Sequence, residues 1–217
     1  MHKPTKILVA DVKEELDWDF RVDHSRIVVK AKDGRVTLSG TVPTYHESKL
    51  AEEGVRTVGG VTAVDNELLV GLVGAAIADA DVAAACTRAL DADKFVPKGA
   101  VRVSVTDGWV TLTGDVRHHF QRQAAEHAIR RVDGVLGVTD KVGFSSEPIP
   151  SDVVDRINKA FRRNAIIDDS LITVTNTGHT IYLDGTTDSW AAREAADDAA
   201  WAAPGVDDVI DRLVIVP

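Results

Sequence analysis

The sequence repeats itself three times. A glycine precedes a Gly-Val pair at the same spacing in three places: Gly40 with Gly60-Val61, Gly114 with Gly134-Val135, and Gly185 with Gly205-Val206. Two constant shifts of the numbering superpose the three segments, one that places Gly40 on Gly114 and one that places Gly114 on Gly185. The superposition is free of gaps over residues 8–70, 82–144 and 153–215. We therefore expect three copies of one folding unit, spanning residues 1–72, 78–146 and 149–217.

Each copy begins with apolar residues spaced four apart, which is typical of a helix with one buried stripe. The stripe residues are Leu8, Val12 and Leu16; Val82, Cys86 and Leu90; and Val153, Ile157 and Phe161. Asp81 and the pair Ser151-Asp152 stand where the N-caps of the later two helices belong. Cys86 is the only cysteine, and its place on the stripe predicts a buried small hydrophobic residue, not a nucleophile.

Two runs with period-two alternation follow, and such runs around a tight turn predict a β-hairpin. The turn residues Asp33-Gly34 and Asp107-Gly108 favour a type I′ turn, whereas Gly178-His179 in the third copy favours type II′. We expect each hairpin to end at the first glycine of its pair, at Gly40 in the first copy.

A second helix with small residues on one face comes next. Gly60, Gly134 and Gly205 are expected at the left-handed C′ position that ends it. A short strand then closes each copy, at Val64–Leu68, Val138–Val142 and Val209–Leu213. The predicted fold class is α+β: three tandem αββαβ modules, each a three-stranded mixed sheet packed against two helices.

The hairpin, the second helix and the closing strand follow one pattern. It reads DGxVTLxG in the hairpin, continues with a helix that has spaced alanines, and ends with GVxxVxN in the closing strand. Residues 33–40 read DGRVTLSG and residues 60–66 read GVTAVDN, while residues 107–114 read DGWVTLTG and residues 134–140 read GVLGVTD. This pattern resembles the BON domain over nearly the whole chain. The third copy departs most, at His179, Asp184 and Asp211.

The resemblance implies a non-enzymatic module without a cofactor. It is found in osmotic-shock-induced periplasmic proteins, secretins, haemolysins and channels, and it is thought to bind phospholipid or to support the envelope. A cytoplasmic relative responds to potassium. The expected function is osmotic or envelope stress adaptation through anionic phospholipid or an envelope protein. The alternatives are a sensor of a monovalent cation or solute, and a scaffold that binds client proteins.

Charge and hydropathy limit the possible partners and the possible location of the protein. The net charge of −9 disfavours non-specific attraction to nucleic acid or to an anionic membrane, because both need a cationic surface. No run approaches the ~20 apolar residues of a membrane span. Only four apolar residues, 7–10, follow the basic start of the sequence as given, whereas an export signal needs roughly 7–15. We therefore expect a cytoplasmic protein, or a periplasmic one if a leader has been removed.

Asn66, Asp140 and Asp211 occupy one aligned position in the last strand. By strand parity they share a face with apolar residues, and a polar group there must be hydrogen-bonded or must bind something. One interpretation is a local side-chain bond inside the module. The other is a contact to a cation or ligand.

The second helix of the middle copy, expected over Arg117–Val132, is rich in basic residues. The candidate contacts to an anionic headgroup are Arg117, His119, Arg122, Arg130 and Arg131. A solvated helix face is the alternative. His119 and His127 are two helical turns apart, which is not the i, i+4 spacing of a metal-binding helix. We expect no metal site.

Aromatic residues form a third candidate surface. Tyr45, His119 and Trp190 align at the start of the second helix, and Trp18 and Trp109 lie near turns. They could form an exposed rim that enters a membrane interface or a partner groove, or they could pack between copies. The sequence contains no phosphate loop, nucleophile elbow or dinucleotide motif.

Overall fold

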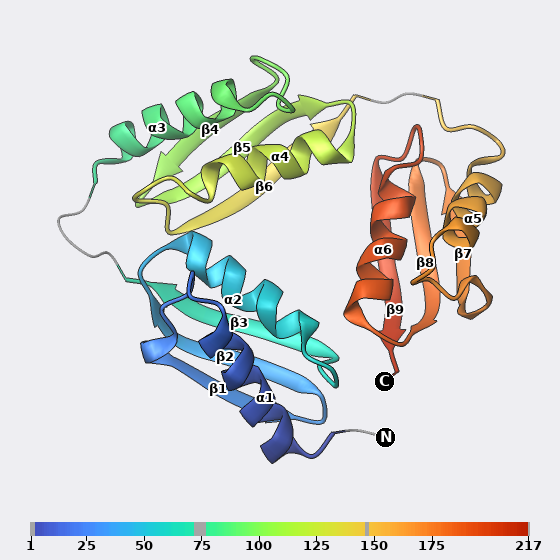
Figure 1. The fold of residues 1–217 in the computed structure, drawn as a ribbon. Coiled ribbons are helices and arrows are strands. Elements are labelled where there is room, and N and C mark those ends of the chain that lie inside the picture. The colour runs from blue at the N-terminus through green and yellow to red at the C-terminus, as the bar shows by residue number, and fades with distance from the viewer. Residues whose placement is uncertain (1–2, 72–76, 146–147, 217) are drawn as a thin grey trace. The chain divides into compact units, whose positions relative to one another are not determined.

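The computed structural model describes residues 3–71, 77–145 and 148–216. These residues form three α+β modules with one order of elements, helix, strand, strand, helix, strand (Figure 1). We call the three described ranges modules 1, 2 and 3. Contacts group the chain into two compact units, one of residues 3–116 and 120–143 and the other of residues 117–119 and the described part of 144–216.

The bounds of the elements are these. Module 1 contains α1 (Thr5–Trp18), β1 (Ile27–Lys32), β2 (Arg35–Val42), α2 (Tyr45–Thr57) and β3 (Ala63–Val70). Module 2 contains α3 (Asp79–Ala92), β4 (Val101–Thr106), β5 (Trp109–Val116), α4 (His119–Ile129) and β6 (Gly137–Phe144). Module 3 contains α5 (Val153–Arg163), β7 (Ile172–Thr177), β8 (Thr180–Thr187), α6 (Trp190–Trp201) and β9 (Asp208–Ile215). Short 3-10 helices, η1 (His24–Arg26) and η2 (Asp169–Leu171), precede β1 and β7.

Each module has its own three-stranded sheet, in which the strands lie in chain order. In modules 1 and 3 the first two strands pair antiparallel and the third pairs parallel to the second. The two helices of a module cover one face of its sheet (Figure 1). The predicted α+β fold with three mixed sheets is confirmed.

The core of each module lies between this sheet and the helices. All nine apolar residues of the predicted helix stripes are buried, Cys86 among them. They meet the hairpin residues of the middle strand, such as Val36 and Leu38, which are fully buried. Alanines on the second helix, such as Ala51 and Ala196, are also fully buried, because a small side chain lets the helix lie close to the sheet.

The hairpin turns have the expected backbone. Asp33 and Gly34 both have positive φ, 50° and 83°, as a type I′ turn requires. Asp107 and Gly108 repeat this geometry with φ of 50° and 74°. In module 3 Gly178 has φ of 58°, and His179 is not among the residues with positive φ, in agreement with the predicted type II′ turn.

The ends of the second helices differ from the prediction. Gly60 and Gly134 have positive φ, but the helices end earlier, at Thr57 and Ile129. The glycines belong to the turn that follows, in which the Val61 N–H donates to the Val58 carbonyl at 3.1 Å. Gly60 is the third residue of that turn, where positive φ is required in type II. The helix predicted over residues 117–132 is correspondingly shorter and begins at His119.

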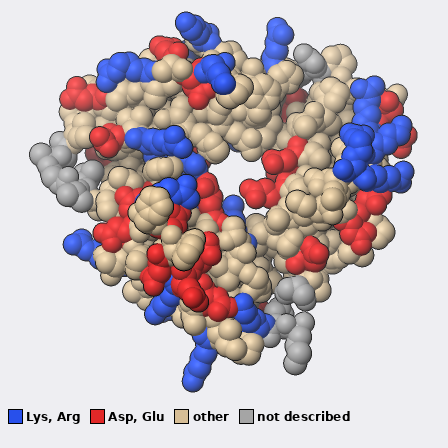
Figure 2. All heavy atoms as spheres, viewed as in Figure 1, with Lys and Arg blue, Asp and Glu red and all other residues tan. Residues whose placement is uncertain are grey.

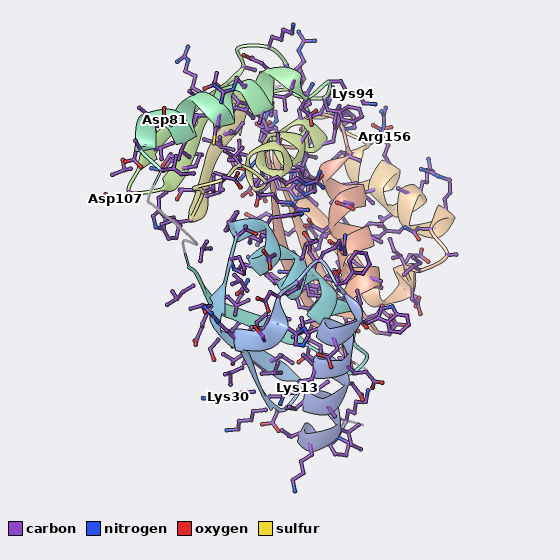
Figure 3. All side chains as sticks on the ribbon, turned by 60° about the vertical axis from the view of Figure 1, so that its left-hand side comes forward. Lys13, Lys30, Asp81, Lys94, Asp107 and Arg156 are labelled. Atoms are coloured by element: carbon purple, nitrogen blue, oxygen red, sulfur yellow. The ribbon has the colours of Figure 1, made fainter. Side chains whose placement is uncertain are left out.

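The predicted N-caps were also wrong in part. α3 begins at Asp79, so Asp81 lies inside the first turn, exposed to solvent (Figure 3). The Asp79 carboxylate instead accepts hydrogen bonds from the Asp107 and Gly108 N–H groups at 2.8 and 2.9 Å, which ties the hairpin turn to the helix. Asp152 is the N-cap of α5 as predicted, but its side chain makes no capping bond.

The glycine expected to end the hairpin lies inside the strand. β2 continues past Gly40 to Val42, and Gly40 pairs with Ile27 with φ of 117°. A Cβ added at Gly40 would lie 2.0 Å from the Arg26 carbonyl oxygen. Gly114 and Gly185 have the same φ region and the same close backbone approach, so a side chain is excluded at this position in all three modules.

We predict that Gly40→Ala lowers the free energy of unfolding by about 2–4 kcal/mol, because the new methyl group meets backbone and the φ is strained. Urea unfolding of the full chain measures this. Gly54→Ala is the matched control, since Gly54 lies in α2 with no atom within 4 Å of an added Cβ. There we expect a gain of up to about 1 kcal/mol. Equal effects at both positions would contradict the argument.

Candidate functional site

The polar position of the last strand is occupied in module 1 by Asn66, which faces α2. Its amide donates to the Ser48 carbonyl and hydroxyl oxygens at 3.1 and 3.0 Å and to the Glu52 carboxylate at 3.2 Å. Its own oxygen accepts from the Leu68 N–H at 3.1 Å. Asn66 therefore connects β3 to α2, and its polar atoms are satisfied within the module.

Modules 2 and 3 make the same connection with an ion pair. Asp140 accepts from the Arg122 guanidinium at 2.5 Å, and Asp211 accepts from Arg193 at 2.6 Å. The second oxygen of each carboxylate accepts from the backbone N–H two residues on, at 2.8 Å in both modules. We call this contact the helix–strand bridge. It corresponds to the local interpretation of the aligned position.

The helix partners of the strand residue were missed from the sequence, although the repeat contains the signal. Ser48, Arg122 and Arg193 occupy one aligned position, and Glu52, Glu126 and Asp197 occupy another. Both sets lie on the second helix, and each keeps a constant spacing from the polar residue of the strand. These two aligned positions of the second helix could therefore have predicted the partners of the polar strand residue.

The bridge in module 3 contains two carboxylates and one guanidinium. Burial raises the pKa of Asp197 to about 7, and the nearby carboxylates of Asp211 and Asp198 act in the same direction. Arg193 opposes them, but it is already paired with Asp211. Asp197 therefore titrates close to neutral pH. In module 1, by contrast, Glu52 pairs with both Arg56 and Lys49.

The basic residues proposed for the middle module differ in exposure and in ion pairing. Arg122 is held in the bridge, and Arg130 is buried beyond the end of α4, where its guanidinium pairs with Glu53 at 2.7 Å within the larger compact unit. Arg117 and Arg131 are exposed, before and after α4 respectively. His119 is part-buried at the start of α4, with its ring centroid 6.3 Å from that of Phe144.

The aromatic residues of the third candidate surface also differ in their exposure to solvent. Trp18 and Trp109 are exposed, whereas Tyr45, His119 and Trp190 are part-buried. The most exposed large apolar side chain among the described residues is Phe20, at 96%, followed by Trp18, at 85%. Phe20 was missed. Its aligned counterparts, Lys94 and Ala165, are not large apolar residues, so Phe20 is no part of the shared core pattern.

A second cationic surface lies on α5, the helix for which no ligand contact was predicted. Figure 2 shows Lys and Arg side chains gathered over this helix. Arg156 and Arg162 pair with Asp152 and Asp169. No carboxylate of the described residues lies within ion-pair distance of Lys159 or Arg163, and both are exposed. Two apolar side chains just beyond the helix, Ile166 and Leu171, are 55% and 47% exposed.

Neither a reactive cysteine nor a metal centre is found among the described residues. Burial raises the pKa of the Cys86 thiol to about 11, so it is not a nucleophile at neutral pH. Across the three described ranges, no group of His, Cys, Asp or Glu side chains could hold a metal ion. No helix there is both long and apolar enough to span a bilayer.

Comparison with known families gives a match that covers most of the chain. The model of the BON domain matches residues 4–71, 78–144 and 151–217. This chain belongs to the BON domain family. Each matched range coincides with one of the three described modules to within a few residues, so the helix–strand bridge is a feature of all three BON modules.

Individual known proteins are also similar to this chain. The osmotically inducible protein Y of Escherichia coli (strain K12) is 34% identical over 136 residues, which is 60% of this BON protein and 68% of the relative. Two structures of CdsD, a structural protein of the type III secretion system of Chlamydia trachomatis, align with 14% identity and a TM-score of 0.27. They cover 97% of this chain and 93% and 98% of their own chains.

We predict that Asp211→Ala costs about 2–3 kcal/mol of unfolding free energy in BON module 3, because the Leu213 N–H loses its acceptor and Arg193 loses its partner. Asp211→Asn keeps an acceptor for the N–H, as Asn66 does in module 1, and should cost about half as much. Urea unfolding of both variants measures the difference. Equal losses would mean that the backbone bond contributes nothing.

A second prediction concerns Asp197, whose pKa rises from 3.8 in the unfolded chain to about 7 in the fold. The protonated carboxyl stabilises the fold at low pH, so this contribution is lost as the pH rises through about 7. Asp197→Asn should flatten the pH dependence of unfolding between these two values. It should also stabilise the chain at pH 8 by about 1–2 kcal/mol, since one pKa unit is roughly 1.4 kcal/mol and solvent screens a part-exposed group. An unchanged pH profile would contradict the assignment.

Proposed function

We propose that this BON protein serves osmotic-stress adaptation by associating with anionic phospholipid, without catalysis. We further propose that the contact is made by a surface that we call the α5 face. It consists of the exposed cations of α5 and the apolar side chains beside them: Arg156, Lys159, Arg162, Arg163, Ile166 and Leu171. The stress role rests on the likeness to the osmotically inducible protein Y, and the site rests on the charge and exposure of this surface.

The observation that carries the proposal is the charge of α5. Between Val153 and Arg163 the helix has four cations and one carboxylate. Its apolar residues, among them Ile157 and Phe161, point into the core of module 3, so the charged residues lie on the outer side. Each Lys or Arg near an anionic membrane surface contributes about 1 kcal/mol to binding. Among the described residues, no carboxylate lies within ion-pair distance of Lys159 or Arg163.

The net charge of −9 disfavours non-specific attraction to an anionic membrane, so the contact depends on the local charge of the α5 face. Charges are screened over about 8 Å at physiological ionic strength, so a lipid surface responds to the nearest face of the protein. The exposed side chains of Ile166 and Leu171 add apolar area at the end of the helix that carries the cations. Apolar side chains beside basic ones are typical of segments that bind at the membrane interface.

Module 2 offers a weaker case. Two of its five candidate residues, Arg122 and Arg130, are held by Asp140 and Glu53. A headgroup would have to break these part-buried pairs, which costs more than it returns. The exposed arginines among the five, Arg117 and Arg131, lie before and after α4.

The test is co-sedimentation with vesicles of phosphatidylglycerol and phosphatidylcholine. We predict binding that weakens as salt is raised, and a loss of at least tenfold in affinity for the pair Lys159→Glu and Arg163→Glu, since two cations near the surface contribute about 2 kcal/mol. The matched control is the pair Lys13→Glu and Lys30→Glu, which makes the same charge change on exposed residues of module 1 (Figure 3).

The control should bind as the unchanged protein does. Equal losses in both pairs would mean that net charge, not the α5 face, governs binding. No binding to these vesicles at low salt would refute the proposal, and binding to pure phosphatidylcholine at equal strength would remove its electrostatic basis.

A further inference from the structure

The first helices of the three modules differ in charge in a regular way. Over the aligned ranges 8–18, 82–92 and 153–163, the first has four carboxylates and one lysine, the second one carboxylate and one arginine, and the third one carboxylate and four cations. The net charges are therefore −3, 0 and +3. The buried stripes are alike in all three, so the difference lies on the outer side of the helices.

Two highly exposed aromatic residues lie at the end of the acidic helix α1 and in the loop after it. Trp18 is the last residue of α1, and Phe20 lies in the loop that follows, with exposed fractions of 85% and 96%. Large exposed apolar patches on a protein surface often mark sites of interaction with a partner. Figure 2 shows Asp and Glu side chains gathered over α1, and Glu14 and Asp17 are exposed there.

The same loop of module 3 has the opposite chemistry. The aligned counterpart of Trp18 is Arg163, and the loop after α5 exposes the aliphatic side chain of Ile166. The α1 end thus offers carboxylates beside exposed aromatic rings, and the α5 face offers cations beside exposed aliphatic side chains. Complementary charge favours association and sets its register, and the apolar side chains on both surfaces can be buried together.

We propose that the acidic, aromatic end of α1 in one copy of this chain docks on the α5 face of a second copy. The surface on module 1, which we call the α1 end, consists of Glu14, Asp17, Trp18 and Phe20. The contact joins two different surfaces, so each copy keeps one α1 end and one α5 face available. Such head-to-tail contacts build open chains of copies unless they close into a ring.

The proposal goes beyond the proposed function and does not depend on it. A lipid surface and the α1 end of another copy would compete for the α5 face, so assembly would be favoured where anionic lipid is absent. The contact involves only a few side chains on each surface, and interfaces below roughly 1,200 Å² form transient complexes. The association should therefore be weak and dependent on concentration. It should also be sensitive to salt, because the screening length falls from about 10 Å at 0.1 M to about 3 Å at 1 M.

Sedimentation velocity of the full chain over a concentration series tests the proposal. At low ionic strength the weight-average mass should rise with protein concentration, and at about 1 M salt the chain should sediment as a monomer. Trp18→Ser with Phe20→Ser should abolish the association at low ionic strength. Both side chains are exposed, so this variant should retain the melting temperature of the unchanged protein.

Two neutralised variants give the sharpest measurement. The pair Glu14→Gln with Asp17→Asn removes charge from the α1 end, and the pair Lys159→Gln with Arg163→Gln removes it from the α5 face. Each variant alone should be monomeric at every concentration. A mixture retains one intact pair of surfaces, so it should form a 1:1 dimer and nothing larger.

The matched control neutralises Lys30 and Lys98 to Gln, two exposed residues outside α1 and the α5 face, and this variant should associate as the unchanged protein does. A chain that is monomeric at all concentrations and salts would overturn the proposal. So would association that persists at about 1 M salt, or a mixture of the two variants that stays monomeric. The Glu14→Gln and Asp17→Asn variant should bind phosphatidylglycerol vesicles normally, which separates this result from the lipid assay.

Discussion

The packing of two helices on one face of a three-stranded sheet is the constraint on which the rest of this protein depends. Each module closes a core of its own, and each has a separate sheet. A module of this size has little apolar material to bury, so nearly every apolar position facing the sheet is used. Phe161 in module 3 and Val12 in module 1, for example, are both fully buried. Little room is left inside for an enclosed site.

The helix–strand bridge shows how a polar group is accommodated next to such a core. A side chain on the inner face of the last strand must find partners, and each module supplies them from its second helix. Module 1 uses a neutral amide, Asn66, whereas modules 2 and 3 use a carboxylate paired with an arginine. The backbone bond two residues on is kept in all three. This explains why different residue types serve at one position, and why Asp197 is left to titrate near pH 7.

The outer faces of the modules are under no such constraint. The fold requires only that the first helix keep its inner stripe, so its outer side is free to change charge from −3 to +3 between modules 1 and 3. Tandem repetition thus provides three similar supports with different surfaces. The binding chemistry of this chain is more naturally sought in those differences than in the shared pattern that identifies the family.

The sequence by itself determined the three modules, the element order, the helix stripes and the turn types, because each depends on local periodicity or on a backbone that only certain residues adopt. It located Gly40 but not its role, since the carbonyl that approaches it belongs to Arg26, the last residue of η1, just before the neighbouring strand β1. It singled out Arg122 and Asp140 for separate reasons. Only the packing of helix on sheet brought them together, and only the tertiary structure decided that Arg130 is buried and Phe20 exposed. Contacts and exposure depend on which surfaces meet, and residues far apart in the chain decide that.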